Sequence, residues 1–85
     1  MVNIIDIPIR EIRSRGFRPM YNMRYILLKQ SIEKNGFNRN FPIHVCRGSF
    51  AGGKKYRVLE GNHRFYICLD LGYETIPCVI EKEKQ

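Results

Sequence analysis

Residues 60–64, Glu-Gly-Asn-His-Arg, combine the side chains of this sequence that are best suited to holding an anion. They stand between a strand-like run, 56–59, and a helix-like run, 65–71. The first backbone N–H groups of a helix lack partners within it and point outward, and the helix dipole favours negative charge there. Arg64 adds a two-pronged donor, and His63 adds a second donor or a proton carrier. The pattern therefore predicts a phosphate-binding turn.

The same residues also have purely structural interpretations, which the sequence leaves open. Gly61 is suited to a tight turn, and Asn62 to capping the helix that follows. Glu60 either ends the strand or accepts a proton from a substrate hydroxyl, in which case it also has the charge to orient magnesium.

The charge balance points to an anionic partner. The chain has 85 residues, with 15 Lys and Arg against 8 Asp and Glu, which gives a formal net charge of +7. Such an excess favours nucleic acid, nucleotides or an acidic protein face. Arg10, Arg13, Arg15 and Arg18 crowd one short segment, which is either a solvated loop or the lining of an anion site.

Neither a metal site nor a membrane segment is indicated. Cys46, Cys68 and Cys78 form no C-x-x-C pair and each lies in an apolar run, so we expect three buried thiols. His44 and His63 are too far apart to suggest a metal motif alone. No apolar run approaches the roughly 20 residues that cross a bilayer, and the amino end lacks the basic region of a signal peptide. We therefore expect a cytoplasmic protein without a membrane partner.

The hydropathy pattern predicts one small α+β domain over residues 1–85, in the order β-α-β-β-α-β. The expected elements are a strand that includes Ile4, Ile5, Ile7 and Ile9 and is ended by Pro8 and a turn at 10–12, a basic loop at 14–19, a helix at 20–35, strands at 43–47 and 56–59, a helix that follows Gly61 and runs to about Leu71, a strand at 76–80 and a charged tail at 81–85. Gly36 and Gly72 are expected to end the two helices. The glycine-rich link 48–54 makes a hairpin of the middle strands, with Phe50 exposed near its tip.

Four segments together resemble the ParB/sulfiredoxin superfamily over nearly the whole chain. They are Ser31-Ile32, residues 41–45 (Phe-Pro-Ile-His-Val), residues 56–64 with their G-x-[HR]-R turn, and residues 71–77 (Leu-Gly-Tyr-Glu-Thr-Ile-Pro). The superfamily includes ParB amino-terminal domains that bind CTP, sulfiredoxins that use ATP, free-serine kinases and ParB-like nucleases. The resemblance implies that a nucleotide phosphate is held at the turn.

Gly61, His63 and Arg64 match that phosphate-binding turn directly. Asn62 falls where sulfiredoxins have their catalytic cysteine and where ParB proteins typically have glutamate. Because an amide cannot form a sulfur intermediate, the resemblance excludes sulfiredoxin chemistry at this position.

The remaining site residues follow from the resemblance as well. Arg24 aligns with a nucleotide-contacting lysine of sulfiredoxins, although a solvated helix face explains it equally well, and Ser31 aligns with a hydroxyl of the same site. Arg18 is expected to add basic support for the phosphates. Glu60 and His63 are the candidate catalytic residues.

The resemblance thus implies a domain that binds ATP or CTP, either with or without Mg²⁺. This domain is expected to serve a DNA-related process. ParB proteins also carry a helix-turn-helix DNA reader, which these 85 residues lack. The alternatives are a sequence-nonspecific DNA-binding module that uses the amino-terminal arginines, and an NTP-dependent phosphotransferase, NTPase or nuclease. Whether the protein is an enzyme, and whether it forms oligomers, stay open.

Overall fold

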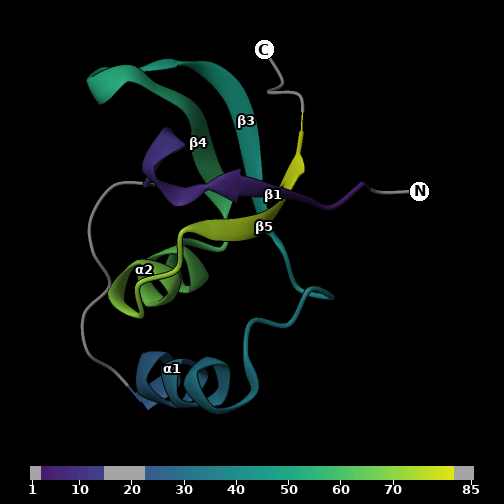
Figure 1. The fold of residues 1–85 in the computed structure, drawn as a ribbon, viewed down its shortest axis with the longest axis vertical. Coiled ribbons are helices and arrows are strands. Elements are labelled where there is room, and N and C mark those ends of the chain that lie inside the picture. Colours follow the sequence, from purple (N-terminus) through teal and green to yellow (C-terminus); the bar gives the residue numbers. More distant parts are fainter. Residues whose placement is uncertain (1–2, 15–22, 82–85) are drawn as a thin grey trace.

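The computed structural model describes residues 3–14 and 23–81. These residues form a five-stranded sheet and two α-helices, with two short 3-10 turns. The elements are β1 (Ile5–Pro8), η1 (Ile9–Glu11), β2 (Ile12–Arg13), α1 (Met23–Asn35), β3 (Ile43–Phe50), η2 (Ala51–Gly53), β4 (Lys54–Glu60), α2 (Asn62–Asp70) and β5 (Thr75–Ile80). Figure 1 shows both helices on one side of the sheet, while the β3–β4 hairpin projects from the opposite end.

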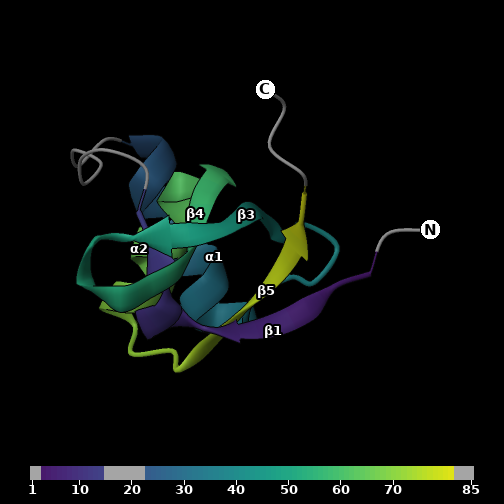
Figure 2. The same cartoon turned by 90° about the horizontal axis from the view of Figure 1, so that it is seen from above.

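The sheet has the order β1-β5-β3-β4-β2, so β1 and β2 lie at opposite edges. Strands β1 and β5 pair antiparallel, as do β3 and β4, whereas β3–β5 and β2–β4 are parallel. Only the three residues of η1 join the two edge strands. Because so short a link spans little distance, the sheet must curl until its edges approach each other (Figure 2).

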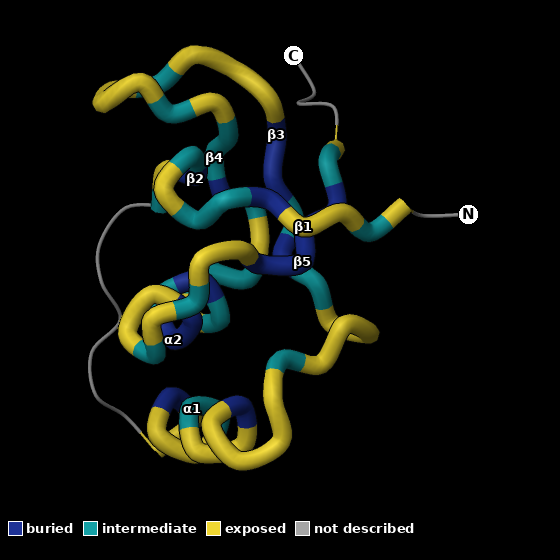
Figure 3. Tube along the Cα trace, viewed as in Figure 1, coloured by how far each residue is buried: buried dark blue, intermediate teal, exposed yellow. Residues whose placement is uncertain are grey.

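The main core fills the inner face of this curled sheet. Val45 and Val58 face each other across β3 and β4, and both are buried against Phe65 of α2. A smaller apolar cluster joins the two helices through Tyr25, Ile32 and Ile67. Figure 3 shows that buried residues follow the central strands, while the hairpin and the outer side of α1 are exposed.

Most elements predicted from the sequence are present. The two helices, the hairpin and the last strand are confirmed, and Gly36 and Gly72 follow the helices with φ of 81° and 80°. Tyr25 belongs to the core between the helices, whereas Tyr21 and the start of the expected helix at residues 20–22 lie outside the described residues. Residues 15–19 of the expected basic loop at 14–19 and residues 82–85 of the expected tail at 81–85 also lie outside them.

Three details of the prediction were wrong. The first strand ends at Pro8 as expected, but Ile9 belongs to the turn, and an unexpected second strand, β2, follows that turn. The hairpin strands are longer than expected, with only η2 between them. Phe50 is a half-buried strand residue, because its ring lies on the backbone of Gly48 and under the guanidinium of Arg57.

None of the helices in the described part of the chain has the length and hydropathy that a bilayer crossing requires.

Candidate functional site

The turn between β4 and α2 is built on a glycine. Gly61 occupies the N-cap position of α2 with φ of 97° and ψ of 30°, a left-handed conformation that side chains disfavour. A β-carbon at this position would come within 2.8 Å of Cγ2 of Ile43. The glycine therefore lets the helix start against β3. Asn62 is the first helical residue and not the cap, which corrects the structural interpretation offered for it.

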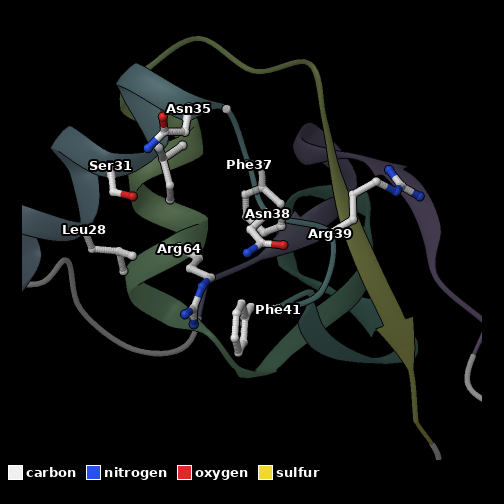
Figure 4. Close-up of a pocket in the computed structure, with 10 residues that line it drawn as sticks. Leu28, Ser31, Asn35, Phe37, Asn38, Arg39, Phe41 and Arg64 are labelled. Carbon is white, nitrogen blue, oxygen red and sulfur yellow. The ribbon is translucent and has the colours of Figure 1, made fainter.

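Two neighbouring hollows open beside this turn. The larger, of about 500 Å³, lies between the carboxyl half of α1, the loop at 36–42 and Arg64 of α2. Its labelled lining residues are seen in Figure 4. The smaller, of about 210 Å³, is lined by residues from the same loop and both strands, with the helix start: Asn40, Phe41, Pro42, His44, Glu60, Gly61 and Arg64.

Phe41 and Arg64 line both cavities and form the wall between them. The guanidinium carbon of Arg64 lies 5.5 Å from the centre of the Phe41 ring, within cation–π range. Figure 4 shows the two side chains next to each other, with the Arg64 nitrogens directed away from the helix. Among the described residues, no carboxylate forms an ion pair with Arg64. The cation is therefore available to a ligand in either cavity.

The loop that carries Phe41 is held in place at several points. The side-chain oxygen of Asn38 accepts a hydrogen bond from the backbone N–H of Asn40 at 2.9 Å, and its carbonyl accepts one from Phe41 N–H at 3.0 Å. Arg39 donates to Asp6 of β1 at 2.8 Å, an exposed ion pair. Beside this loop, Nδ1 of His44, which lines the smaller cavity, contacts the carboxylate of Glu81. The contacts of Asn38 and Arg39 hold the backbone of the loop that carries Phe41.

The helix start is also electropositive. The first turn of α2 contains no acidic residue, so the helix dipole and the Arg64 guanidinium act in the same direction. The nearest carboxylate in sequence is Glu60, which is exposed and belongs to β4. This arrangement can hold an anion at the wall between the cavities, with Glu60 beside it.

The structure gathers only some of the residues that the sequence singled out. Ser31 and Arg64 line the larger cavity, and Glu60, Gly61 and Arg64 line the smaller one. His63 lines neither, because its ring packs near Tyr25 of α1 with the ring centres 6.0 Å apart. Asn62 and the exposed Arg24 also lie outside both linings. Arg18 lies outside the described residues.

The sequence interpretation missed the loop that closes the site. Asn35, Asn38 and Phe41 line the larger cavity, although the sequence indicated only a polar turn there. Phe41 offered the one usable signal, because a large aromatic residue between a polar turn and a proline can contact a ligand when it is exposed. Phe41 is 57% exposed in the structure.

The three thiols lie away from the site, as expected from their apolar surroundings. Cys46, Cys68 and Cys78 are all buried and reduced, and none lines either cavity. Burial raises the pKa of Cys68 to about 12. Burial also raises the pKa of Cys78 to about 12, with smaller contributions from Asp6 and Cys68. Such thiols are poor nucleophiles at neutral pH.

Solved structures share this fold. The chromosome-partitioning protein ParB from Caulobacter crescentus, in complex with CTP-gamma-S, superposes with a TM-score of 0.76 at 20% identity, over 98% of this chain and 46% of that one. A free serine kinase in complex with AMP gives a TM-score of 0.70 at 20% identity, over 94% of this chain and 31% of the kinase. Sulfiredoxin from Arabidopsis thaliana gives 0.69 at 30% identity, over 95% of this chain and 86% of that one.

The chain belongs to the ParB/sulfiredoxin superfamily. It spans about half of the ParB structure and about a third of the kinase, but most of the sulfiredoxin. No family model and no curated protein matches the sequence. The predicted α+β fold of this superfamily is confirmed.

Within the superfamily, the difference from sulfiredoxin lies at the turn itself. Asn62 stands where the resemblance puts a catalytic cysteine, and the thiols of the chain are buried elsewhere. Residues 60–64, which form the turn, contain no cysteine.

Proposed function

We propose that this chain is a nucleotide-binding domain that holds phosphates of ATP or CTP at the start of α2. The observation that carries the proposal is the position of Arg64, which lines two cavities at a helix start without acids in its first turn and forms no ion pair with a carboxylate of residues 3–14 or 23–81. Two relatives with the same fold were solved with CTP-gamma-S and with AMP. A nucleotide is the class of ligand that accounts for both the cation at the helix start and the ligands of these relatives.

The larger cavity suits the nucleoside. Its volume of about 500 Å³ falls in the range of small-molecule sites. The apolar side chains of Leu28 and Ile32 offer contact area, while Ser31 and Asn35 offer hydrogen bonds to a sugar or base. Arg64 would then face the phosphates.

Mg²⁺ would bind together with the nucleotide. Among the described residues that line the two cavities, Glu60 alone carries a carboxylate. Mg²⁺ in nucleotide sites is bound by phosphates with one or two carboxylates and several waters, which this donor set fits. Bound Mg²⁺ would supply charge neutralisation for the phosphates.

Calorimetry with ATP, CTP and ADP, with and without Mg²⁺, tests the proposal. The loss of one charge-assisted contact predicts that Arg64→Ala weakens binding by about ten- to a hundredfold. Arg47→Ala is the matched control, because it removes an exposed arginine of β3 that lines neither cavity. Equal affinity of wild type and Arg64→Ala, or no binding by the wild type, would contradict the proposal.

A second candidate is phosphoryl transfer with Glu60 as the proton acceptor. The smaller cavity supports it, because Glu60 lines it together with Arg64, whereas His63 is turned towards Tyr25. A hydroxyl bound there would lie beside both the carboxylate and the phosphates. Glu60→Gln should abolish transfer or hydrolysis while nucleotide binding is retained. Turnover that survives this change removes Glu60 as the base.

We also propose that the nucleotide serves a DNA-related process, since the CTP-gamma-S-bound relative is a chromosome-partitioning protein. This part of the proposal rests on kinship and on the net charge of +7. DNA binding through the amino-terminal arginines stays the alternative. Of that cluster, Arg10 and Arg13 are exposed, while Arg15 and Arg18 lie outside the described residues.

A further inference from the structure

We propose that Asn38 contacts the base of the bound nucleotide and makes the larger cavity prefer a base that carries a carbonyl oxygen, so that CTP binds more tightly than ATP. This role of Asn38 depends on the proposed nucleotide site and adds a choice between its two candidate ligands. The observation behind it is the hydrogen bond that fixes the side-chain amide of Asn38.

The amide of Asn38 has a defined orientation. Its side-chain oxygen accepts a hydrogen bond from the backbone N–H of Asn40 at 2.9 Å. A backbone N–H can only donate, so the amide atom that it meets must be the oxygen, and the two ends of the amide cannot be exchanged. The Nδ2 group makes no hydrogen bond within residues 3–14 and 23–81. Asn38 therefore has two N–H donors to offer to a ligand.

The loop at 36–42 offers the larger cavity donors but no side-chain acceptor. Figure 4 shows the Asn38 nitrogen on the side of Arg64 and the Asn38 oxygen on the side of Arg39. Arg39 also lines this cavity, and a guanidinium cannot accept a hydrogen bond. The loop's remaining side chains in the lining, Phe37 and Phe41, are apolar. A ligand edge that faces the loop is therefore stabilised by acceptor atoms.

The side-chain acceptors of this cavity lie on α1. Figure 4 shows α1 and the loop on opposite sides of the cavity. Ser31 and Asn35 of α1 each carry an oxygen that can accept a hydrogen bond as well as a group that can donate one. Leu28 and Ile32 of the same helix supply apolar surface for a flat ring. The two sides of the cavity thus differ in what they can accept from a ligand.

This difference separates adenine from the other bases. Cytosine, uracil and guanine each carry a carbonyl oxygen, which can accept a hydrogen bond from Asn38. Adenine carries none, and its N1 and N7 atoms stand beside the 6-amino group, whose N–H would face the donors of Asn38. Two opposed donors leave both groups without a partner, which costs binding free energy. Cytosine suits both sides, because its amino group can donate to α1 while its carbonyl accepts from the loop.

The backbone of the loop brings Asn38 next to a surface for the base. The carbonyl of Asn38 accepts a hydrogen bond from the N–H of Phe41 at 3.0 Å, so both residues belong to one turn. Phe41 is exposed and lines the cavity, and an aromatic ring offers stacking surface to any base. A base that lies along this ring brings its edge within reach of the Asn38 amide.

Titration calorimetry with ATP, ITP and CTP, at one salt and Mg²⁺ concentration, is the test. ITP is the matched probe, because it carries a carbonyl where ATP has the 6-amino group, on the same triphosphate. Asn38→Asp keeps an oxygen that accepts from the Asn40 N–H and replaces the donor group by an acceptor. Gln30→Glu is the control, because it adds the same charge at an exposed position of α1 that lines neither cavity.

Wild type should bind CTP and ITP about fivefold more tightly than ATP, the effect of one hydrogen bond. The readout is the ratio of the ITP and ATP affinities, because the charge added in Asn38→Asp lowers both affinities alike. In Asn38→Asp we expect ATP to bind at least as tightly as ITP, whereas Gln30→Glu should keep the wild-type ratio. Asn38→Ser retains an acceptor for the turn without an amide donor. Its ratio should be close to one, which provides the test if the Asp variant does not fold.

Equal affinities of the wild type for ATP, ITP and CTP would overturn this role of Asn38, as would a wild-type ratio in both Asn38 variants. If Arg64→Ala still weakens those equal affinities, the nucleotide site stands and only the choice of base falls. A ratio that Gln30→Glu changes as much as Asn38→Asp does would overturn the role too, because added charge alone would explain it. Absence of binding by all three nucleotides would remove the site together with the preference.

Discussion

Gly61 lies so close to Ile43 that any side chain at the start of α2 would collide with β3. A β-carbon on Gly61 would be 2.8 Å from Cγ2 of Ile43 and 3.2 Å from its Cα, and the φ of 97° disfavours side chains as well. Strain and overpacking together predict that Gly61→Ala lowers the free energy of unfolding by about 2–4 kcal/mol, as measured by urea denaturation.

Gly36 provides the matched control for this change. Its φ of 81° is similar, yet nothing lies within 4 Å of a β-carbon built on it. Gly36→Ala should therefore cost only the backbone strain, about 1 kcal/mol. Equal losses in the two variants would mean that the contact with Ile43 relaxes without cost, and the close approach of helix and strand would no longer explain the glycine.

Phe41 should matter to binding more than to stability. Phe41 is 57% exposed, so little burial is lost on truncation, but its ring is the surface on which Arg64 lies. Loss of an exposed cation–π contact predicts that Phe41→Ala weakens nucleotide binding by about two- to fivefold, while Phe41→Tyr retains it. Titration calorimetry measures both.

Leu69→Ala is the control for Phe41→Ala, because Leu69 is an exposed apolar residue of α2 that lines neither cavity. Its truncation should leave the affinity unchanged. If Phe41→Ala also binds with wild-type affinity, the ring does not position Arg64 for the ligand.

The ends of the helices could be predicted from the sequence because their signals are local. Gly36, Gly61 and Gly72 all have positive φ, a conformation that glycine adopts at little cost. The short strand β2 could not be predicted, since its two residues gain strand geometry only by pairing with Tyr56 and Arg57, more than forty positions away. Such pairing leaves no pattern in a two-residue segment.

The candidate site was predictable only in part, for a geometric reason. Consecutive residues of an α-helix point about 100° apart, so Asn62, His63 and Arg64 cannot all face one cavity. Arg64 faces the loop at 36–42, whereas His63 faces Tyr25. Asn38 and Phe41 join the cavity lining because the loop that carries them packs beside segments distant in sequence. A short sequence motif does not contain this information.

The geometry predicts unequal roles for the two α1 residues assigned by resemblance. Ser31 lines the larger cavity, so loss of one hydrogen bond should make Ser31→Ala bind nucleotide about fivefold more weakly. Arg24 is exposed and lines neither cavity, so Arg24→Gln should bind within about twofold of wild type at moderate salt. Calorimetry measures the nucleotide affinity of both variants. A larger loss of affinity in Arg24→Gln than in Ser31→Ala would show that the ligand extends along α1 beyond the cavity.

The buried thiols predict how stability depends on alkaline pH. The pKa values of Cys68 and Cys78 rise from 9.0 to about 12 on folding, so the folded state holds these protons more tightly than the unfolded state. Their contribution to the free energy of unfolding is therefore complete below about pH 9 and is lost as the pH rises towards 12.

Modification by a thiol reagent tests the burial of the thiols directly, without a contribution from the titration of Tyr and Lys. All three thiols are buried, so the reagent should modify the native protein only through opening, and far more slowly than it modifies the urea-unfolded chain at the same pH. One thiol that reacts rapidly in the native protein at neutral pH would contradict their burial.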